Sequence, residues 1–166
     1  MRYAEITEAI EDKLLHATSV DSLYEILEAN EIRANTGHPI THTGGEKRSQ
    51  HWAVRPGDVS DNGYLKGVSL TRSASFARNW KSRNWQKDDG VVLVLDAGKI
   101  RRDFRVMPIS FWGNGVRHEA EEFVDGPIKP VSRYLIRIEA KADVAAKHDL
   151  ASNLSLFNFP VRLAIV

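Results

Sequence analysis

The chain has 166 residues, of which 42% are hydrophobic and 27% charged, a composition typical of one globular domain that can bury a core. Its formal net charge of +1 gives no overall field that would favour nucleic acid or an anionic membrane. The absence of cysteine excludes disulfides, thiolate metal sites and a cysteine nucleophile. Because no signal-peptide pattern and no bilayer-length apolar run is found, we expect a single cytoplasmic domain, residues 1–166, that does not use a membrane.

The first part of the chain is predicted to contain a helix, a strand and a second helix. Residues 2–12 place apolar side chains at helical spacing, which indicates a short amphipathic helix. The segment 13–18 is typical of a strand. It leads into a helix over 20–29, for which Ser19 or Asp21 is the expected cap.

Hydrophobic periodicity disappears between residues 34 and 65, where glycines and prolines punctuate a polar stretch. A loop this long in a compact domain is usually functional or disordered, and we expect a flexible flap over the functional site. His38 and His42 are four residues apart, but they lie in a stretch rich in glycine and proline and not on a predicted helix, so no metal site is predicted.

The remainder of the chain is predicted to be mainly strands. The expected strands are 66–71, 91–95, 104–109, 121–124, 131–138 and 161–166, and the expected helices begin at Ser73 and span 142–150. Early helices followed by many strands predict a mixed α+β domain rather than a doubly wound sheet.

Three carboxylates, Glu119, Glu121 and Glu122, stand immediately before an apolar pair at 123–124. In a strand, Glu119 and Glu121 would project from one side and Glu122 from the other. Two carboxylates directed into a cleft can hold a sugar hydroxyl and stabilise a developing positive charge. The alternative is a solvated edge strand whose charges discourage aggregation.

Two further predicted strands carry polar groups where bulky apolar residues would serve structure alone. His16 and Thr18 precede a helix start, where backbone N–H groups bind polar or anionic ligands. Ser69 lies between two aliphatic residues and shares a strand face with Thr71. The alternatives are a buried histidine bonded to backbone and hydroxyls that bond their strand neighbours.

The order of these segments resembles the ADP-ribosyltransferase family. Leu-Leu-His-Ala-Thr-Ser at 14–19 is similar to the family's first motif, in which a small residue and a hydroxyl follow a histidine. Gly-Val-Ser-Leu-Thr at 67–71 is similar to the second motif. Glu-Ala-Glu-Glu-Phe-Val at 119–124 is similar to the third, two glutamates one residue apart before a strand. The resemblance spans about residues 13–138 and implies two packed, mostly antiparallel sheets with flanking helices.

The resemblance implies NAD as co-substrate and no metal. His16 would hydrogen-bond the nicotinamide-side ribose, Ala17 would offer its backbone to the nicotinamide amide, and Thr18 would contact the adenosine portion. Ser69 would support NAD or orient the catalytic glutamate. Many relatives carry tyrosine at this second-motif position, which leaves the subclass open.

The resemblance also assigns roles to the carboxylates. Glu121 is the expected catalytic glutamate, and Glu119 would position or deprotonate the acceptor. Glu122 is the alternative catalytic residue, because a one-residue shift of register would place it in the pocket.

Three more residues complete the expected NAD-binding set. Thr71 lies on the same strand as Ser69, and Arg72, directly after the second motif, would contact the pyrophosphate. Trp52 lies in a glycine-bearing loop and is expected to stack on nicotinamide or adenine.

The expected function is therefore NAD-dependent mono-ADP-ribosylation of a protein or nucleic-acid target, as in a phage or toxin-type effector with an antitoxin partner. An RNA 2′-phosphotransferase-like enzyme is an alternative on the same fold, but it would need a set of pocket arginines that is not evident. A non-catalytic binding or inhibitor protein is the alternative from a different class. A nuclease built on His38, His42 and His51 is the weakest alternative.

Overall fold

The computed structural model describes residues 12–39, 64–78, 89–109 and 121–166. The strands are β1 Lys13–Ser19, β2 Asn35–Pro39, β3 Tyr64–Thr71, β4 Gly90–Asp96, β5 Val106–Ile109, β6 Glu121–Val124, β7 Leu135–Ala140 and β8 Leu163–Ile165. The helices are α1 Val20–Ala29, α3 Ala74–Arg78, α4 Ala97–Asp103, the 3₁₀ helix η1 Val131–Arg133, α5 Ala142–Lys147 and α6 Leu150–Leu154. Among these helices, none is long and apolar enough to cross a membrane.

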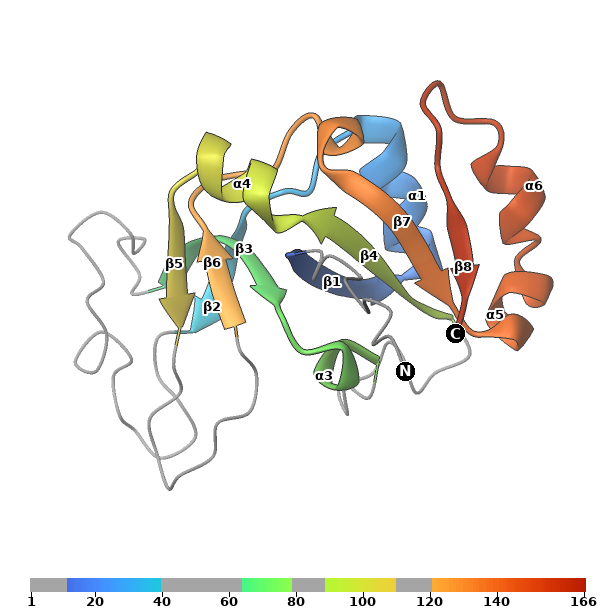
Figure 1. The fold of residues 1–166 in the computed structure, drawn as a ribbon, viewed down its shortest axis with the longest axis horizontal. Helices are drawn as coiled ribbons and strands as arrows, with labels where there is room; N and C mark the ends of the chain where they lie inside the picture. Colours follow the sequence, from blue (N-terminus) through green and yellow to red (C-terminus); the bar gives the residue numbers. More distant parts are fainter. Residues whose placement is uncertain (1–11, 40–63, 79–88, 110–120) are drawn as a thin grey trace, which may run out of the picture.

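The described strands form one sheet in the order β5-β6-β3-β1-β4-β7-β8, with β2 paired to β3 beside this path (Figure 1). Neighbouring strands are antiparallel except β7 and β8, which confirms the predicted mostly antiparallel α+β class. The sheet is continuous, which differs from the two packed sheets that we expected. Its halves join between β1 and β3 at one register pair, Leu15 with Thr71, whereas β1 pairs with β4 along its whole length.

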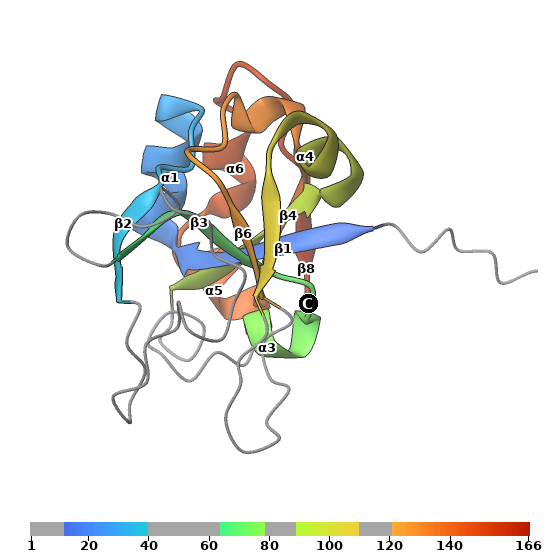
Figure 2. The same cartoon turned by 90° about the vertical axis from the view of Figure 1, so that its left-hand side faces the viewer.

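The larger hydrophobic core lies on the sheet face that α1 and α4 cover. Leu23 of α1 and Ile100 of α4 are fully buried in it, beside apolar side chains of the central strands. A smaller cluster on the other face joins Leu15 and Val94 to Ala77 of α3. Figures 1 and 2 show α1 and α4 on one side of the sheet and α3 on the other. The sheet is therefore covered by apolar contacts on both faces.

The unit from β1 to α1 agrees with its prediction. The hydroxyl of Ser19 accepts a hydrogen bond from the Ser22 N–H at 3.2 Å, which makes Ser19 the N-cap. Asn30 ends the helix in the left-handed conformation, with φ of 50°. Local spacing and capping residues were sufficient to predict this unit.

Two elements in the middle of the chain differ from their prediction. The expected loop 34–65 contains β2 at its start and the beginning of β3 at its end, because backbone pairing between these strands needs no alternation of side chains. Helix α4 was not predicted. It begins where the side chain of Asp96 accepts the Lys99 N–H at 2.9 Å, directly after the central strand β4.

The C-terminal elements are more divided than expected. The predicted strand 131–138 separates into η1 and β7, and the predicted helix 142–150 separates into α5 and α6 around Asp149, whose φ is +44°. A positive φ interrupts a right-handed helix, so one helix could not continue through Asp149. The predicted helix 2–12 and most of the predicted flap lie outside the described residues.

Candidate functional site

The three strands that carry the predicted site residues are neighbours in the sheet, in the order β6-β3-β1 (Figure 1). Thr71 pairs with Glu121 and Leu70 pairs with Glu122 across β3 and β6. Thr71 also pairs with Leu15 of β1. Three short segments that are far apart in the sequence therefore meet side by side.

His16 links two of these strands directly. Its Nδ1 lies 3.2 Å from the backbone oxygen of Ser69. A carbonyl oxygen can only accept, so Nδ1 must carry the proton and Nε2 is the acceptor of the neutral ring. Burial lowers the pKa of His16, and the hydrogen bond to Ser69 acts in the opposite direction. The ring is therefore neutral at pH 7 and presents a defined tautomer.

The neighbours of His16 on β1 alternate between the two sheet faces. His16 pairs with Leu93 and Thr18 with Val91, both members of the larger core cluster, whereas Ala17 pairs with Val92 of the smaller cluster. Thr18 is 7% exposed, and His16 and Ala17 are partly buried. Thr18 thus shares the face of His16, and Ala17 occupies the opposite face.

The end of β3 is fixed by its backbone and by one hydroxyl. Thr71 is 6% exposed, and its hydroxyl accepts the Ser73 N–H at 3.0 Å, which closes the turn into α3. Ser69 stands opposite the fully buried Phe123 of β6. Gly67 has φ of +145°, and a Cβ added there would lie 2.3 Å from the Val124 backbone oxygen. The close approach of β3 to β6 at this point therefore requires glycine.

Glu122 is a buried carboxylate that two arginines neutralise. It is 2% exposed, and its Oε1 accepts from Arg101 Nη2 at 3.0 Å and from the guanidinium of Arg72. Its Oε2 accepts from Arg101 Nε at 3.3 Å. The hydrogen bond to Glu122 raises the pKa of Arg101 despite the opposing effect of burial, and Asp12 pairs with the same guanidinium.

The structure therefore brings together some of the predicted site residues. His16 contacts Ser69, Thr71 and Glu121 share a register pair, and Arg72 pairs with Glu122 while its side chain stays 54% exposed. The predicted residues Glu119 and Trp52 lie outside the described residues.

Sequence reasoning missed the part that Arg101 takes in this cluster. Arg101 contacts Glu122 from α4, a helix that was not predicted. The available signal was Asp96 as an N-cap after a buried strand, followed by Ile100 as an apolar residue facing the core.

A second buried carboxylate, Glu139 of β7, lies on the opposite face of the sheet, where Arg137 also stands. Arg137 Nη2 donates to it at 2.7 Å and Arg78 Nη2, from α3, at 2.9 Å. Burial raises the pKa of Glu139, but the hydrogen bonds and charges of both arginines hold it below its usual value. This cluster ties α3, which follows the predicted second motif, to the distant strand β7.

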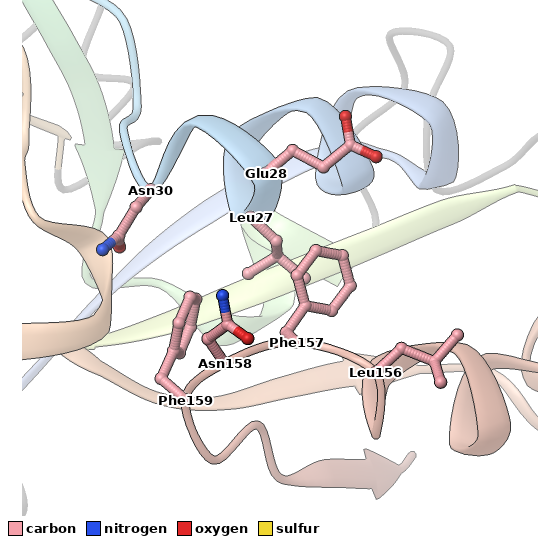
Figure 3. A pocket seen from close by; sticks show the side chains of 7 residues that line it. All are labelled: Leu27, Glu28, Asn30, Leu156, Phe157, Asn158 and Phe159. Carbon is pink, nitrogen blue, oxygen red and sulfur yellow. The ribbon is translucent and has the colours of Figure 1, made fainter.

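A hollow of about 330 Å³ lies between α1 and the C-terminal segment. Figure 3 shows Leu27, Phe157 and Phe159 around it, and none of its lining residues belongs to the predicted site. Leu156, which also lines the hollow, is 79% exposed. Within the described part of the chain, no group of three or more metal-ligating side chains is found.

No family model and no curated protein matches the sequence. Solved structures do match over nearly the whole chain. DarT of Thermus sp. 2.9 in complex with NAD+ aligns with a TM-score of 0.59 and 12% identity, covering 95% of this chain and 96% of that chain. DarT in complex with ADP-ribosylated ssDNA aligns with a TM-score of 0.57 and 12% identity, covering 94% of each chain. The complex with carba-NAD+ gives a TM-score of 0.56.

These alignments confirm the predicted fold class: the chain has an ADP-ribosyltransferase-like α+β fold. At 12% identity they describe the course of the backbone and not the chemistry of individual residues.

Proposed function

We propose that this protein is an NAD-dependent mono-ADP-ribosyltransferase whose acceptor is nucleic acid. The observation that carries the proposal is the hydrogen bond from His16 to Ser69, on a strand that pairs with the Glu121-bearing strand. An imidazole, a hydroxyl-bearing strand and acidic positions thus lie on three adjacent strands of a fold shared with an NAD-binding protein.

The tautomer of His16 suits the recognition of a ribose. Because Nδ1 donates to the Ser69 carbonyl, Nε2 is available to accept a hydrogen bond from a ribose hydroxyl. The lowered pKa keeps the ring neutral, and an imidazolium could not accept such a bond. We assign the nicotinamide-side ribose to His16, the nicotinamide amide to the Ala17 backbone and the adenosine portion to Thr18.

Glu121 is proposed as the catalytic glutamate. NAD supplies the ADP-ribosyl group and nicotinamide as the leaving group. When the bond between the ribose and nicotinamide breaks, positive charge develops on the ribose carbon, as in glycoside hydrolysis. A carboxylate held beside that carbon stabilises the transition state more than the ground state. Glu119 is proposed to orient the attacking atom of the acceptor or to take its proton.

The remaining candidates are assigned to NAD binding. Ser69 and Thr71 lie on the strand between His16 and the acidic strand, where they would support NAD or orient the glutamate. Arg72 keeps an exposed side chain while it pairs with Glu122, so its remaining N–H groups are suited to the pyrophosphate. Trp52 is proposed to stack on nicotinamide or adenine.

The choice of nucleic acid as acceptor is supported by one alignment. DarT of Thermus sp. 2.9 was solved with ADP-ribosylated ssDNA, and this chain follows that backbone over 94% of its length. A toxin-type role in the cytoplasm, with an antitoxin partner, is part of the same proposal.

The test is incubation of the purified protein with NAD labelled in the ADP-ribose portion and either single-stranded DNA, single-stranded RNA or a protein extract. Label on DNA or RNA, with equimolar release of nicotinamide, is the expected result. Glu121→Gln should lower the rate by roughly 10²–10³-fold. Glu28→Gln, an exposed carboxylate on α1, is the matched control and should leave the rate unchanged.

Three outcomes would contradict parts of the proposal. Transfer of label to protein alone would reject nucleic acid as the acceptor. Transfer that persists when Glu119, Glu121 and Glu122 are all replaced by Gln would reject the site. A folded protein that neither releases nicotinamide nor transfers label would reject the enzyme and favour a binding or inhibitor protein.

A further inference from the structure

We propose that Glu122 is a positioning residue that anchors β6 through Arg72 and Arg101, and that it thereby holds Glu121 in its catalytic register. This inference rests on the proposed function and separates the roles of two adjacent carboxylates. The anchor is defined as the buried carboxylate of Glu122 together with these two arginines.

The anchor joins three parts of the fold that are separated in the sequence. Glu122 belongs to β6, Arg101 extends from α4, and Arg72 stands directly after β3. Arg101 also pairs with Asp12, the residue before β1, so the first strand is tied to the same guanidinium. One carboxylate therefore connects β6 to both strands that carry the other proposed site residues.

The occupied oxygens of Glu122 make it unsuitable as the reacting carboxylate. Oε1 accepts from both arginines, and Oε2 accepts from Arg101 Nε at 3.3 Å and Nη2 at 3.2 Å. Two guanidinium charges offset its single negative charge, and the carboxylate is only 2% exposed. A group that must stabilise a developing cation needs uncompensated charge and an open oxygen, and Glu122 has neither.

The same contacts explain how Glu122 acts on its neighbour. Strand side chains alternate between faces, so a slip of β6 by one residue would remove Glu122 from the core face, where it stands opposite Leu70. Such a slip would break the ion pairs and leave an unpaired charge in a buried place. The anchor therefore opposes slippage and fixes the pairing of Glu121 with Thr71.

The test is a double-mutant cycle on the full chain with the variants E122L, R101L and E122L/R101L. The measurements are kcat and KM for nicotinamide release, and hydrogen exchange of the 121–124 amides by mass spectrometry. E122L should lower kcat about tenfold and accelerate exchange in β6, because it removes both ion pairs and leaves Arg101 and Arg72 without their carboxylate. R101L should have a smaller effect in the same direction, because Arg72 still pairs with Glu122. The double variant should lower kcat and accelerate exchange no further than E122L alone, because both variants remove the same contact between Glu122 and Arg101.

R102L is the matched control, since Arg102 is the next residue on α4 and its side chain is 64% exposed. It should change neither kcat nor exchange. E122Q, which keeps the side-chain volume, takes the place of E122L if the latter fails to fold by circular dichroism. E121Q should lose roughly 10²–10³ in kcat, and R101L should restore none of that loss.

Two results would overturn the inference. If E122L or E122Q abolishes turnover while hydrogen exchange of β6 is unchanged, and R101L keeps full turnover, Glu122 is itself the reacting carboxylate. If neither kcat nor exchange responds to E122L, the anchor has no positioning role. A parent protein without nicotinamide release would refute the proposed function alone, since the exchange measurements still decide whether Glu122 holds β6 in place.

Discussion

Replacement of Gly67 by alanine tests whether the close approach of β3 and β6 holds the candidate site together. Gly67 lies two residues before Ser69 and has φ of +145°, a conformation that residues with a side chain rarely adopt. The added Cβ would stand 2.3 Å from the backbone oxygen of Val124 and 3.2 Å from its carbonyl carbon. Backbone atoms cannot rotate away as a flexible side chain would, so the two strands must separate.

The expected loss of stability has two parts. Holding alanine in this backbone conformation costs about 1–3 kcal/mol, and the steric overlap adds about 1–3 kcal/mol. Together they lower the free energy of unfolding by roughly 2–6 kcal/mol, out of the 5–15 kcal/mol that is usual for a domain. For a chain of this size, each kcal/mol corresponds to roughly 2–4 °C in Tm.

Chemical denaturation monitored by circular dichroism measures the effect, with two glycines as internal controls. Gly126 has φ of +80° but nothing within 4 Å of its added Cβ, so Gly126→Ala should cost only about 1–2 kcal/mol of strain. Gly98 lies in α4 with its nearest contact at 3.4 Å, and Gly98→Ala should stabilise by about 0.5–1 kcal/mol. If Gly67→Ala were no more destabilising than Gly126→Ala, the strand contact described here would be wrong.

Three further predictions concern polar contacts. Because the folded pKa of His16 is lowered, its contribution to stability is present above about pH 6.5 and is lost as the pH falls through the folded pKa. Denaturation midpoints should therefore fall more steeply between pH 7 and pH 5 in the parent than in His16→Gln, and equal slopes would contradict this. The folded pKa of Glu139 is also lowered, so its contribution is present above about pH 4.5 and lost on further acidification. Glu139→Gln should lower the free energy of unfolding at pH 7, measured by urea denaturation, by about 3 kcal/mol. Below about pH 4.5 the free energy of unfolding of this variant should depend less on pH than that of the parent. An unchanged free energy of unfolding at pH 7 would refute the role of the arginine pairs. Asn30→Ala should cost about 2–3 kcal/mol, because Asn30 exchanges two hydrogen bonds with Ser132 and holds a positive φ. Asn30→Gly should lose less stability than Asn30→Ala, because glycine adopts the positive φ without strain. Equal losses in both variants would show that the positive φ at this position does not affect stability.

Local signals in the sequence were sufficient to predict several helices and strands. The cap at Ser19, the apolar spacing of α1 and the continuous apolar run of β4 each lie within one short segment, and the structure agrees with all three. The α+β class followed from the number and order of such segments, and the resemblance to ADP-ribosyltransferases led to the fold that the alignments confirm. The residue roles that the resemblance implied stay predictions.

Local signals failed where an element depends on a distant partner. β2 has no alternating pattern and exists because its backbone pairs with β3. The continuity of the sheet depends on the pairing of Leu15 with Thr71, which lie more than fifty positions apart in the chain. Neither pairing is visible in the composition of either segment, so the sequence pattern predicted a loop at β2, and the two separate sheets were expected from the family resemblance alone.

The acidic cluster shows most clearly which features the sequence determines and which depend on the tertiary structure. The sequence by itself determined that Glu121 and Glu122 adjoin and that a strand would direct them to opposite faces. Only the tertiary structure decided that Glu122 is buried, because its partners Arg101, from α4, and Arg72, from the turn after β3, are distant in the sequence. The physical reason is that periodicity and capping act within a few residues, whereas charge compensation and strand register are set by whichever distant segments meet when the chain folds.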